Sequence, residues 1–328
     1  MKALIARRLS GLEALTSDEV SVPAPGPGEI LIGVAAAGLH LADVAALSGD
    51  RQPRPDLPFV PGLEAAGLVA AVGEGVSGFQ PGDKVVAFLD WGGMAEGAVA
   101  KAAVCARIPD DMTFPKAAAL PIAYAGALLA LRERARITPG DTVLVLGAGG
   151  HSGLAAVDIA KKLGARVLAV ASGETRGSEA AERGADAVID GSERPLSESV
   201  MALTGNGGVQ VVFDPVGGDA FEMAMPTLAV GGRIISAGFA GGRIPRMNMA
   251  ALYARDAAMI SANLPLAVKA DQALACSALR DVIAWAAAGE IVPRIAAQFT
   301  FVEAHAAFNY VKSRRNAGAV VVTIEKAG

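Results

Sequence analysis

The segment from residue 141 to about residue 263 constrains the fold more than any other part of the chain. Short apolar runs, such as "TVLVLG" (142–147), "ARVLAVA" (165–171) and "ADAVID" (185–190), alternate with amphipathic stretches of helical spacing. Strands that are apolar on both faces must be covered by helices on both sides. The alternation therefore predicts an α/β fold with a doubly wound parallel sheet.

The flanking parts of the chain have a different texture. The first hundred residues are rich in Gly and Pro and contain short apolar runs such as "GEILIGVAAAGL" (28–39), which predict β-strands; no long helix is evident before "FPKAAALPIAYAGALLALRERA" (114–135). Late strands near 292–300 and 318–325 fit this β-rich part better than the parallel sheet. We therefore predict a β-rich domain from residues 1–122 and 266–328, interrupted by a dinucleotide-binding domain at 123–265.

Bulk properties exclude several classes of protein. The chain has 328 residues and a net charge of −4 without a long basic run, which disfavours nucleic acid as a partner. No uninterrupted apolar stretch reaches the roughly 18 residues of a membrane span. Arginines interrupt the start "MKALIARRLSG" where a signal peptide would be apolar, so we expect a cytoplasmic protein. Cys105 and Cys276 lack metal-site spacing and are expected to be buried thiols.

The stretch "LGAGGHSG" (146–153) follows the first apolar strand and precedes the first helix. A glycine turn at this place lets the backbone approach a phosphate, and the N–H groups of the helix N-terminus attract anions. The spacing is not G-x-G-x-x-G, because Ser152 stands where the last glycine would be. A plain connecting turn is the alternative, but the strands and helices on both sides favour a cofactor loop.

The loop, together with "PFVPGLEAAGLVAAVGEGVSGFQPGDKV" and "GGVQVVFDPVGGDAF", resembles the zinc-free quinone oxidoreductase branch of the medium-chain dehydrogenase/reductase superfamily. The resemblance implies a Rossmann sheet inserted in a GroES-like β-rich domain, and a homodimer formed near "DAAMISANL". We expect cofactor contacts along the loop, at Gly147, Gly149, Gly150, His151, Ser152 and Gly153; for His151 the alternative is a side chain that points to solvent. The pair "HS" at 151–152 departs from the "GV" that is usual in the branch.

The end of the second strand, "AVASGETRG", indicates which cofactor binds. Ser172 stands where an NAD site has an acidic residue, and Arg176 follows it. A hydroxyl and a cation suit a 2′-phosphate, which predicts NADPH, although Arg176 is alternatively a solvated helix charge. The resemblance adds Arg314 as a second cation, whereas Gly191 replaces a tyrosine that the family often has.

Two later strand ends, "DPVGG" and "SAGF", should line the nicotinamide end of the site. The resemblance places cofactor contacts at Val216, Gly238 and Phe239. Strand-end turns without a ligand role are the alternative.

The resemblance also shows where zinc ligands stand in the zinc-dependent relatives. The three positions correspond to His40, Leu63 and a residue near Ile122, and two aliphatic side chains cannot bind zinc. We therefore expect no metal site, and Glu64 is expected to be a structural hydrogen-bond acceptor.

Without a metal, hydrogen-bond donors must polarise the substrate carbonyl. His40 stands where the branch usually has Asn and is the first candidate catalytic residue, followed by Tyr124 in "PIAYAG". The alternatives are a packing histidine and a core tyrosine. Arg51 and Gly126 replace a tyrosine and a threonine of the family and leave the substrate open.

The sequence thus predicts an NADPH-dependent, zinc-independent reductase that transfers hydride to quinones or α,β-unsaturated carbonyls. One rival is an acyl-CoA enone reductase of the acryloyl- or crotonyl-CoA type. The other is a non-catalytic NADPH-binding protein. Partners are expected to be a small-molecule substrate and a second copy of the chain, with neither nucleic acid nor membrane.

Overall fold

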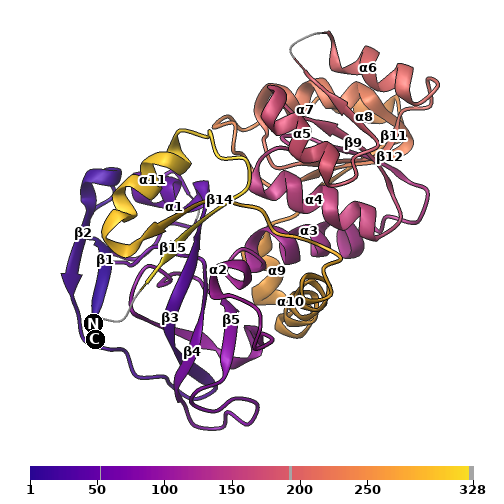
Figure 1. The fold of residues 1–328 in the computed structure, drawn as a ribbon. Helices are drawn as coiled ribbons and strands as arrows, with labels where there is room; N and C mark the ends of the chain where they lie inside the picture. The colour runs from indigo at the N-terminus through magenta and orange to yellow at the C-terminus, as the bar shows by residue number, and fades with distance from the viewer. Residues whose placement is uncertain (52, 192–193, 325–328) are drawn as a thin grey trace. The chain divides into compact units, whose positions relative to one another are not determined.

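The computed structural model of the chain describes residues 1–51, 53–191 and 194–324 (Figure 1). The chain divides into two compact units, one formed by Met1–Ile122 and Val268–Gly328 and the other by Ala123–Ala267. The boundary expected at 265/266 differs by two residues from this division. Residues 325–328 of the expected β-rich domain lie outside the described residues.

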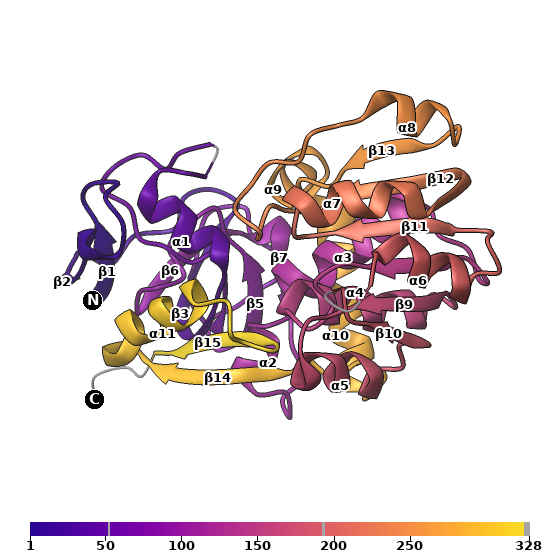
Figure 2. The same cartoon turned by 90° about the horizontal axis from the view of Figure 1, so that it is seen from above.

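The unit Ala123–Ala267 is built on a six-stranded sheet in the order β10-β9-β8-β11-β12-β13, in which every pairing is parallel. Figure 2 shows these strands lying side by side. The strands are β8 (Thr142–Val145), β9 (Arg166–Val170), β10 (Ala187–Ile189), β11 (Val209–Asp214), β12 (Leu228–Ser236) and β13 (Ala258–Ser261). The predicted doubly wound parallel sheet is therefore confirmed.

The strand order places β8 beside β11, although the two are far apart in the sequence, with Val143 opposite Val211. The chain winds one way from β8 to β10 and the other way from β11 to β13, so the order reverses between β8 and β11. Ligands of open α/β sheets bind outside the carboxyl ends of the strands at such a switch point.

Helices connect these strands, and the apolar faces of the helices cover the sheet. They are α4 (His151–Lys162), α5 (Glu174–Glu182), α6 (Leu196–Leu203), α7 (Gly218–Ala224) and α8 (Met249–Tyr253). Leu144, Val212 and Ile234 of the central strands are completely buried in a core that also contains Phe221 of α7. The continuous apolar character of the strands thus follows from burial on both faces.

The other unit is built on a seven-stranded, mostly antiparallel sheet. Its order is β14-β15-β3-β4-β5-β7, with β6 also pairing with β3. The strands are β3 (Glu29–Leu39), β4 (Glu64–Val72), β5 (Lys84–Phe88), β6 (Gly97–Lys101), β7 (Cys105–Arg107), β14 (Ile295–Thr300) and β15 (Ala319–Thr323), beside a hairpin of β1 (Lys2–Ala6) and β2 (Leu15–Glu19). Val320 of β15 lies opposite Leu39 of β3, so the late strands join the β-rich part, as predicted (Figure 1).

Helices in this unit include one that the sequence analysis missed. The helix α1 (Leu41–Ser48) follows β3 directly, whereas we expected no long helix before residue 114. Its eight residues are too few for a clear periodicity, and it is stabilised at its ends: Asp43 accepts a hydrogen bond from the His40 N–H, and Gly49 ends it at a φ of 76°. The later helices of this unit are α10 (Gln272–Ala287) and α11 (Ala304–Lys312).

The expected helical segment 114–135 is broken into shorter pieces. These are α2 (Phe114–Ala117), α3 (Gly126–Leu128) and wider π-helical turns at Pro121–Ala125 and Leu129–Arg134. By length and composition alone, Phe114–Arg134 could cross a membrane. However, 72% of its most apolar window is buried inside the protein, which is typical of a core helix. The helix α9 (Leu264–Ala270) begins at the end of the parallel-sheet unit.

We propose that β13 forms a homodimer, as the resemblance implies. This strand ends the sheet, and Met259 on it is 41% exposed, beside exposed Met249 and Tyr253 on α8. An apolar, unpaired strand edge favours pairing with a second copy. We expect a dimer in sedimentation at micromolar concentration, and Met259→Lys should weaken it. Met223→Lys, which changes a half-exposed methionine of α7, is the control and should leave assembly intact. A monomeric wild type would refute the proposal.

Candidate active site

The glycine loop lies at the switch point between β8 and β11. The N–H of Leu146 donates to Phe213 O on β11 (3.0 Å), and the N–H of Ala148 donates to Val170 O at the end of β9 (2.9 Å). Gly150 is the N-cap of α4, with no side chain capping the helix. The loop is therefore fixed by three strands, and it leads directly into the N-terminus of α4, a place where backbone N–H groups favour an anion.

Three glycines of the loop are required by close packing. A Cβ on Gly153 would lie 2.1 Å from Gly147 O, and a Cβ on Gly147, whose φ is +59°, would lie 2.7 Å from Val216 Cγ2. A Cβ on Gly149 would lie 2.3 Å from Arg176 Cβ. Gly150 differs, because its nearest neighbour would be at an ordinary 3.5 Å. Although the spacing departs from G-x-G-x-x-G, a glycine stands at each of the three places where α4, the residue Val216 after β11, or α5 approaches the turn.

The contact at Gly149 places Arg176 beside the loop. Arg176 lies in the first turn of α5, and its aliphatic stem packs where a side chain on Gly149 would be. Ser172 is exposed just beyond the end of β9. The structure therefore brings Arg176 to the glycine loop and leaves Ser172 on the same strand end. At Gly191 there is ordinary space for a side chain, since a Cβ would lie 3.7 Å from Val170 Cγ1.

The strand ends after β11 and β12 meet on the other side of the loop. The Gly241 N–H donates to Val216 O (2.7 Å), and a Cβ on Gly238 would lie 3.1 Å from Pro215 O. The ring of Phe239 lies against Gly217 and is half exposed. Val216, Gly238 and Phe239 are thus gathered in one place, and their contacts with a cofactor stay predictions.

Asp214, which the sequence analysis did not select as a site residue, holds this turn. Its carboxylate is completely buried and accepts hydrogen bonds from the N–H groups of Val216 (2.8 Å) and Gly217 (2.9 Å). Burial raises the pKa of Asp214, although these two hydrogen bonds oppose the rise. An Asp two residues before a backbone turn is the available signal for such a bond.

Tyr124 is a core residue in this structure. Its side chain is completely buried, and its hydroxyl donates to Asp158 Oδ2 (2.8 Å), which also pairs with Arg183 (2.7 Å). Burial and the charge of Asp158 raise the pKa of Tyr124 well above its ordinary value. This engagement of the hydroxyl inside the parallel-sheet unit favours the alternative of a core tyrosine, and the candidate catalytic role of Tyr124 stays an untested prediction.

His151 and Ser152 open α4. The ring centroid of His151 lies 6.1 Å from that of Tyr124, with the planes tilted by 58°. The ring thus has an aromatic neighbour within its own unit. Contacts of His151 and Ser152 with a phosphate stay predictions.

His40 belongs to the other unit, where it joins β3 to α1. Its Nε2 lies 2.6 Å from Glu64 Oε1, and its side chain is about 10% exposed. The second Glu64 oxygen accepts the Ile122 N–H (2.7 Å), so Glu64 has the acceptor role expected for it. A Cβ on Gly38 would lie 1.9 Å from Glu64 Oε1, so glycine is required there to admit the carboxylate.

The charges around His40 favour its protonated form. Burial alone lowers the pKa of His40, but the charge of Glu64 and the hydrogen bond to it, together with Asp43, outweigh burial and raise the pKa above its ordinary value. A larger fraction of His40 is therefore protonated at neutral pH than of a free histidine, and the protonated ring is a hydrogen-bond donor at both nitrogens.

The three positions that hold zinc in the zinc-dependent relatives contain a different arrangement. Leu63 is buried and aliphatic, and Ile122 contributes its backbone N–H to Glu64. Among the residues that the structure describes, no group of three or more His, Cys, Asp or Glu side chains is placed to hold a metal ion. Here the carboxylate of Glu64 pairs with His40 and accepts the Ile122 N–H.

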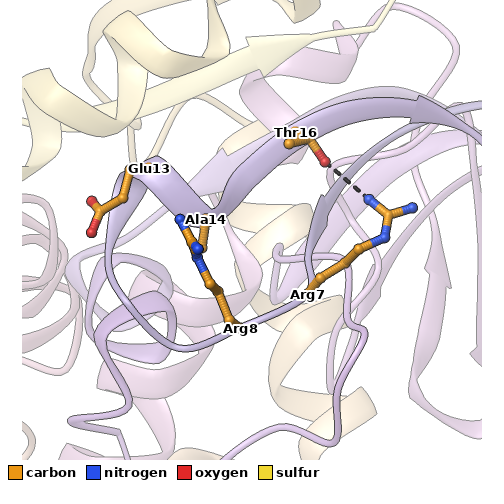
Figure 3. A pocket seen from close by; sticks show the side chains of 5 residues that line it. All are labelled: Arg7, Arg8, Glu13, Ala14 and Thr16. Carbon is orange, nitrogen blue, oxygen red and sulfur yellow. Dashed lines mark hydrogen bonds between the residues drawn. The ribbon is translucent and has the colours of Figure 1, made fainter.

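Two further features concern the β-rich unit. Arg314 follows α11 and has left-handed backbone geometry, with a φ of 57°; its expected contact with the cofactor stays a prediction. A hollow of about 230 Å³ is lined by Arg7, Arg8, Glu13, Ala14 and Thr16. Figure 3 shows how these side chains lie. Arg7 is bound there to Thr16 and Asp18, and the hollow shares no residue with the candidate site.

Comparisons with known proteins agree with this geometry. Residues 26–110 match the alcohol dehydrogenase GroES-like domain, and residues 153–277 match the zinc-binding dehydrogenase domain. Quinone oxidoreductase-like protein 2 of Mus musculus is 34% identical over 314 residues, which are 95% of this chain and 90% of that protein. The chain belongs to the quinone oxidoreductase branch of the medium-chain dehydrogenase/reductase superfamily.

Solved structures of this medium-chain branch have the same fold. A quinone oxidoreductase of Pseudomonas syringae pv. Tomato DC3000 gives a TM-score of 0.92 at 27% identity, covering 98% of this chain and 99% of that one. A mycobacterial protein complexed with NADPH gives a TM-score of 0.92 at 29% identity, covering 98% and 100%. This medium-chain reductase is therefore an enzyme that uses a nicotinamide cofactor, which argues against the non-catalytic alternative.

The packing of the loop predicts unequal effects of adding one methyl group. Gly153→Ala should lower the free energy of unfolding by about 1–3 kcal/mol, because the methyl would overlap Gly147 O. Gly150→Ala is the matched control and should change it much less, since its methyl has ordinary space. Urea unfolding of both variants without cofactor measures the difference. Equal stabilities would contradict the assigned packing.

Proposed function

We propose that this medium-chain reductase is NADPH-dependent and zinc-independent, and that it reduces quinones or α,β-unsaturated carbonyls by hydride transfer. The observation that carries the cofactor choice is the contact of Arg176 with Gly149, which brings a cation beside the phosphate loop, while Ser172 stands where an NAD site has an acidic residue. The NADPH bound by the mycobacterial relative supports the same choice.

The residues present fit a bound NADPH. The N–H groups at the start of α4 would hold the pyrophosphate, and Arg176 with Ser172 would hold the 2′-phosphate. The turn stapled by Asp214 would set Val216 against the nicotinamide. When bound, NADPH supplies a hydride at the nicotinamide C4 for an electron-poor carbon of the substrate.

The remaining requirement of the reaction is stabilisation of charge on the substrate oxygen. His40, paired with Glu64 and with a raised pKa, would donate a hydrogen bond to this oxygen as hydride arrives, and would deliver the proton that completes reduction. Glu64 orients the ring and stabilises the imidazolium, and Asp43 fixes the backbone of His40. The proposal uses no metal, so chelators should leave activity intact.

Several substrate types are compatible with this chemistry. Simple quinones and enones are the proposed substrates, and enoyl-CoA esters are the alternative within the same family. A panel of all three, followed by NADPH oxidation, distinguishes them. If no member of the panel supported NADPH oxidation, the proposed activity would be overturned.

The cofactor choice predicts the effect of removing Arg176. NADPH should bind more tightly than NADH, and Arg176→Ala should remove most of the difference, since charge-assisted hydrogen bonds contribute about 1.5–3 kcal/mol. Arg166→Ala is the control. Arg166 is the first residue of β9, at the end of the strand away from Ser172, and its guanidinium donates to Leu203 O. Titration of both cofactors measures the preference. Equal wild-type affinity for NADPH and NADH would disprove the assignment.

The role of His40 predicts a separate result. His40→Ala should lower kcat by about 10²–10³, less where water substitutes, with little change in NADPH affinity. His40→Asn should retain activity, because the amide is also a donor and is usual in the branch. Wild-type turnover by His40→Ala on every accepted substrate would make His40 a packing residue. Steady-state kinetics and cofactor titration provide both readings.

A further inference from the structure

Arg51 replaces a residue of the family that is often tyrosine, and the structure gives it a defined place. It follows α1, and its N–H donates to Ala45 O (3.3 Å). Its guanidinium lies over the ring of Trp91, 4.6 Å from the ring centroid. The edge of Phe59 packs against Trp91 in turn, with 5.1 Å between the centroids. The cation is thus supported by aromatic side chains and is not a freely moving surface charge.

One nitrogen of this guanidinium has no hydrogen-bond partner in the part of the chain that the structure describes. Arg51 Nη1 is buried and has no hydrogen-bond acceptor among the described residues. Buried donors are nearly always hydrogen-bonded, so an unpartnered one on a charged group indicates a place for an acceptor.

The carboxylates near Arg51 are already engaged by other groups. The two oxygens of Asp43 accept the N–H groups of His40 (2.9 Å) and Gly62 (3.0 Å). Asp90 is exposed and pairs with Lys269 (3.4 Å). Both carboxylates lie within electrostatic range of Arg51, yet neither forms a hydrogen bond with it.

The guanidinium also lies near His40. Burial and, after it, the positive charge of Arg51 act to lower the pKa of His40, against the stronger combined effect of Glu64 and Asp43. His40 and Arg51 flank α1, one at its start and the other just after its end. A group bound to Arg51 would therefore lie within the same part of the β-rich unit as the candidate proton donor.

We propose that Arg51 is a specificity-determining residue that binds a carboxylate of the substrate, so that the preferred substrates are enones or quinones carrying an anionic group near the reacting carbons. The inference rests on the proposed function and narrows its substrate class. The planar guanidinium presents paired N–H groups that match the two oxygens of a carboxylate. The contact with the Trp91 ring holds the guanidinium in place before the substrate binds.

A matched pair of small substrates tests the inference. trans-4-Oxo-2-pentenoate carries a carboxylate next to its enone, and its methyl ester is the neutral counterpart. We expect wild-type kcat/KM to be higher for the acid. Arg51→Gln should reduce the acid-to-ester ratio of kcat/KM by at least about tenfold, as expected for a lost charge-assisted pair. Arg51→Lys should restore part of the ratio.

Arg54→Gln is the control variant. Arg54 is a nearby exposed cation that donates to Gly49 O (3.0 Å), and its replacement should leave the acid-to-ester ratio unchanged. A ratio unaltered by Arg51→Gln, or altered equally by Arg54→Gln, would overturn the inference. Loss of both substrates in equal proportion would show that Arg51 has a structural role, which also overturns it.

A second experiment distinguishes binding of a substrate carboxylate by Arg51 from binding of the phosphates of an acyl carrier. Crotonyl-CoA is compared with crotonyl-pantetheine, which lacks the nucleotide phosphates. If Arg51→Gln lowers the ratio for this pair and not for the acid–ester pair, the carboxylate assignment is wrong.

Binding measurements keep the inference separate from the proposed function. Calorimetric titration of 4-oxopentanoate, the saturated acid, is made with wild type, Arg51→Gln and Arg51→Lys in the presence of NADP⁺. Binding that requires a cation at position 51 supports the inference even if no quinone or enone is turned over. Turnover of the neutral ester with no effect of Arg51 would instead retain the proposed function and refute the inference.

Discussion

The close approach of α4 to the end of β8 is the contact on which the cofactor site depends. It needs Gly153, because a side chain there would overlap Gly147 O. It places the N-terminus of α4, which favours anions, at the loop. The same turn lies against Val216, which follows the neighbouring β11, and against Arg176 of α5. One packed turn therefore connects the phosphate site to the proposed 2′-phosphate and nicotinamide contacts.

A buried carboxylate has a comparable position in the β-rich unit. Glu64 accepts the Ile122 N–H, pairs with His40 and occupies the space that Gly38 leaves free. Its charge raises the pKa of His40 although burial acts in the opposite direction. A buried carboxylate without partners would be unfavourable, so Glu64 and His40 stabilise one another and hold the imidazole in place.

Two arginines show how surroundings decide what a cation can do. Arg176 lies on a glycine beside a helix N-terminus, where anionic phosphates are favoured. Arg51 lies over the ring of Trp91, near the candidate proton donor, and one of its buried nitrogens has no acceptor among the residues described in the structure. The proposed roles are accordingly recognition of the cofactor for Arg176 and of the substrate for Arg51.

Much of the fold followed from local patterns in the sequence. Apolar runs between amphipathic stretches predicted the parallel sheet, and the Gly–Pro-rich flanks with late strands predicted the second, β-rich sheet, because periodicity and turn chemistry are local properties. The eight-residue helix α1 was missed because it is too short to show a period. The proposed helix over 114–135 was recognised, but its division by π-helical turns was not.

The site was less completely determined by the sequence alone. The sequence determined the glycine loop and the absence of ligating side chains at Leu63 and Ile122, because these depend on residue identity. Only the tertiary structure decided that the Tyr124 hydroxyl binds Asp158, that Glu64 pairs with His40, and that Arg51 lies on Trp91. These partners are 34, 24 and 40 residues apart along the chain, and their contacts depend on how strands and helices pack rather than on any local pattern.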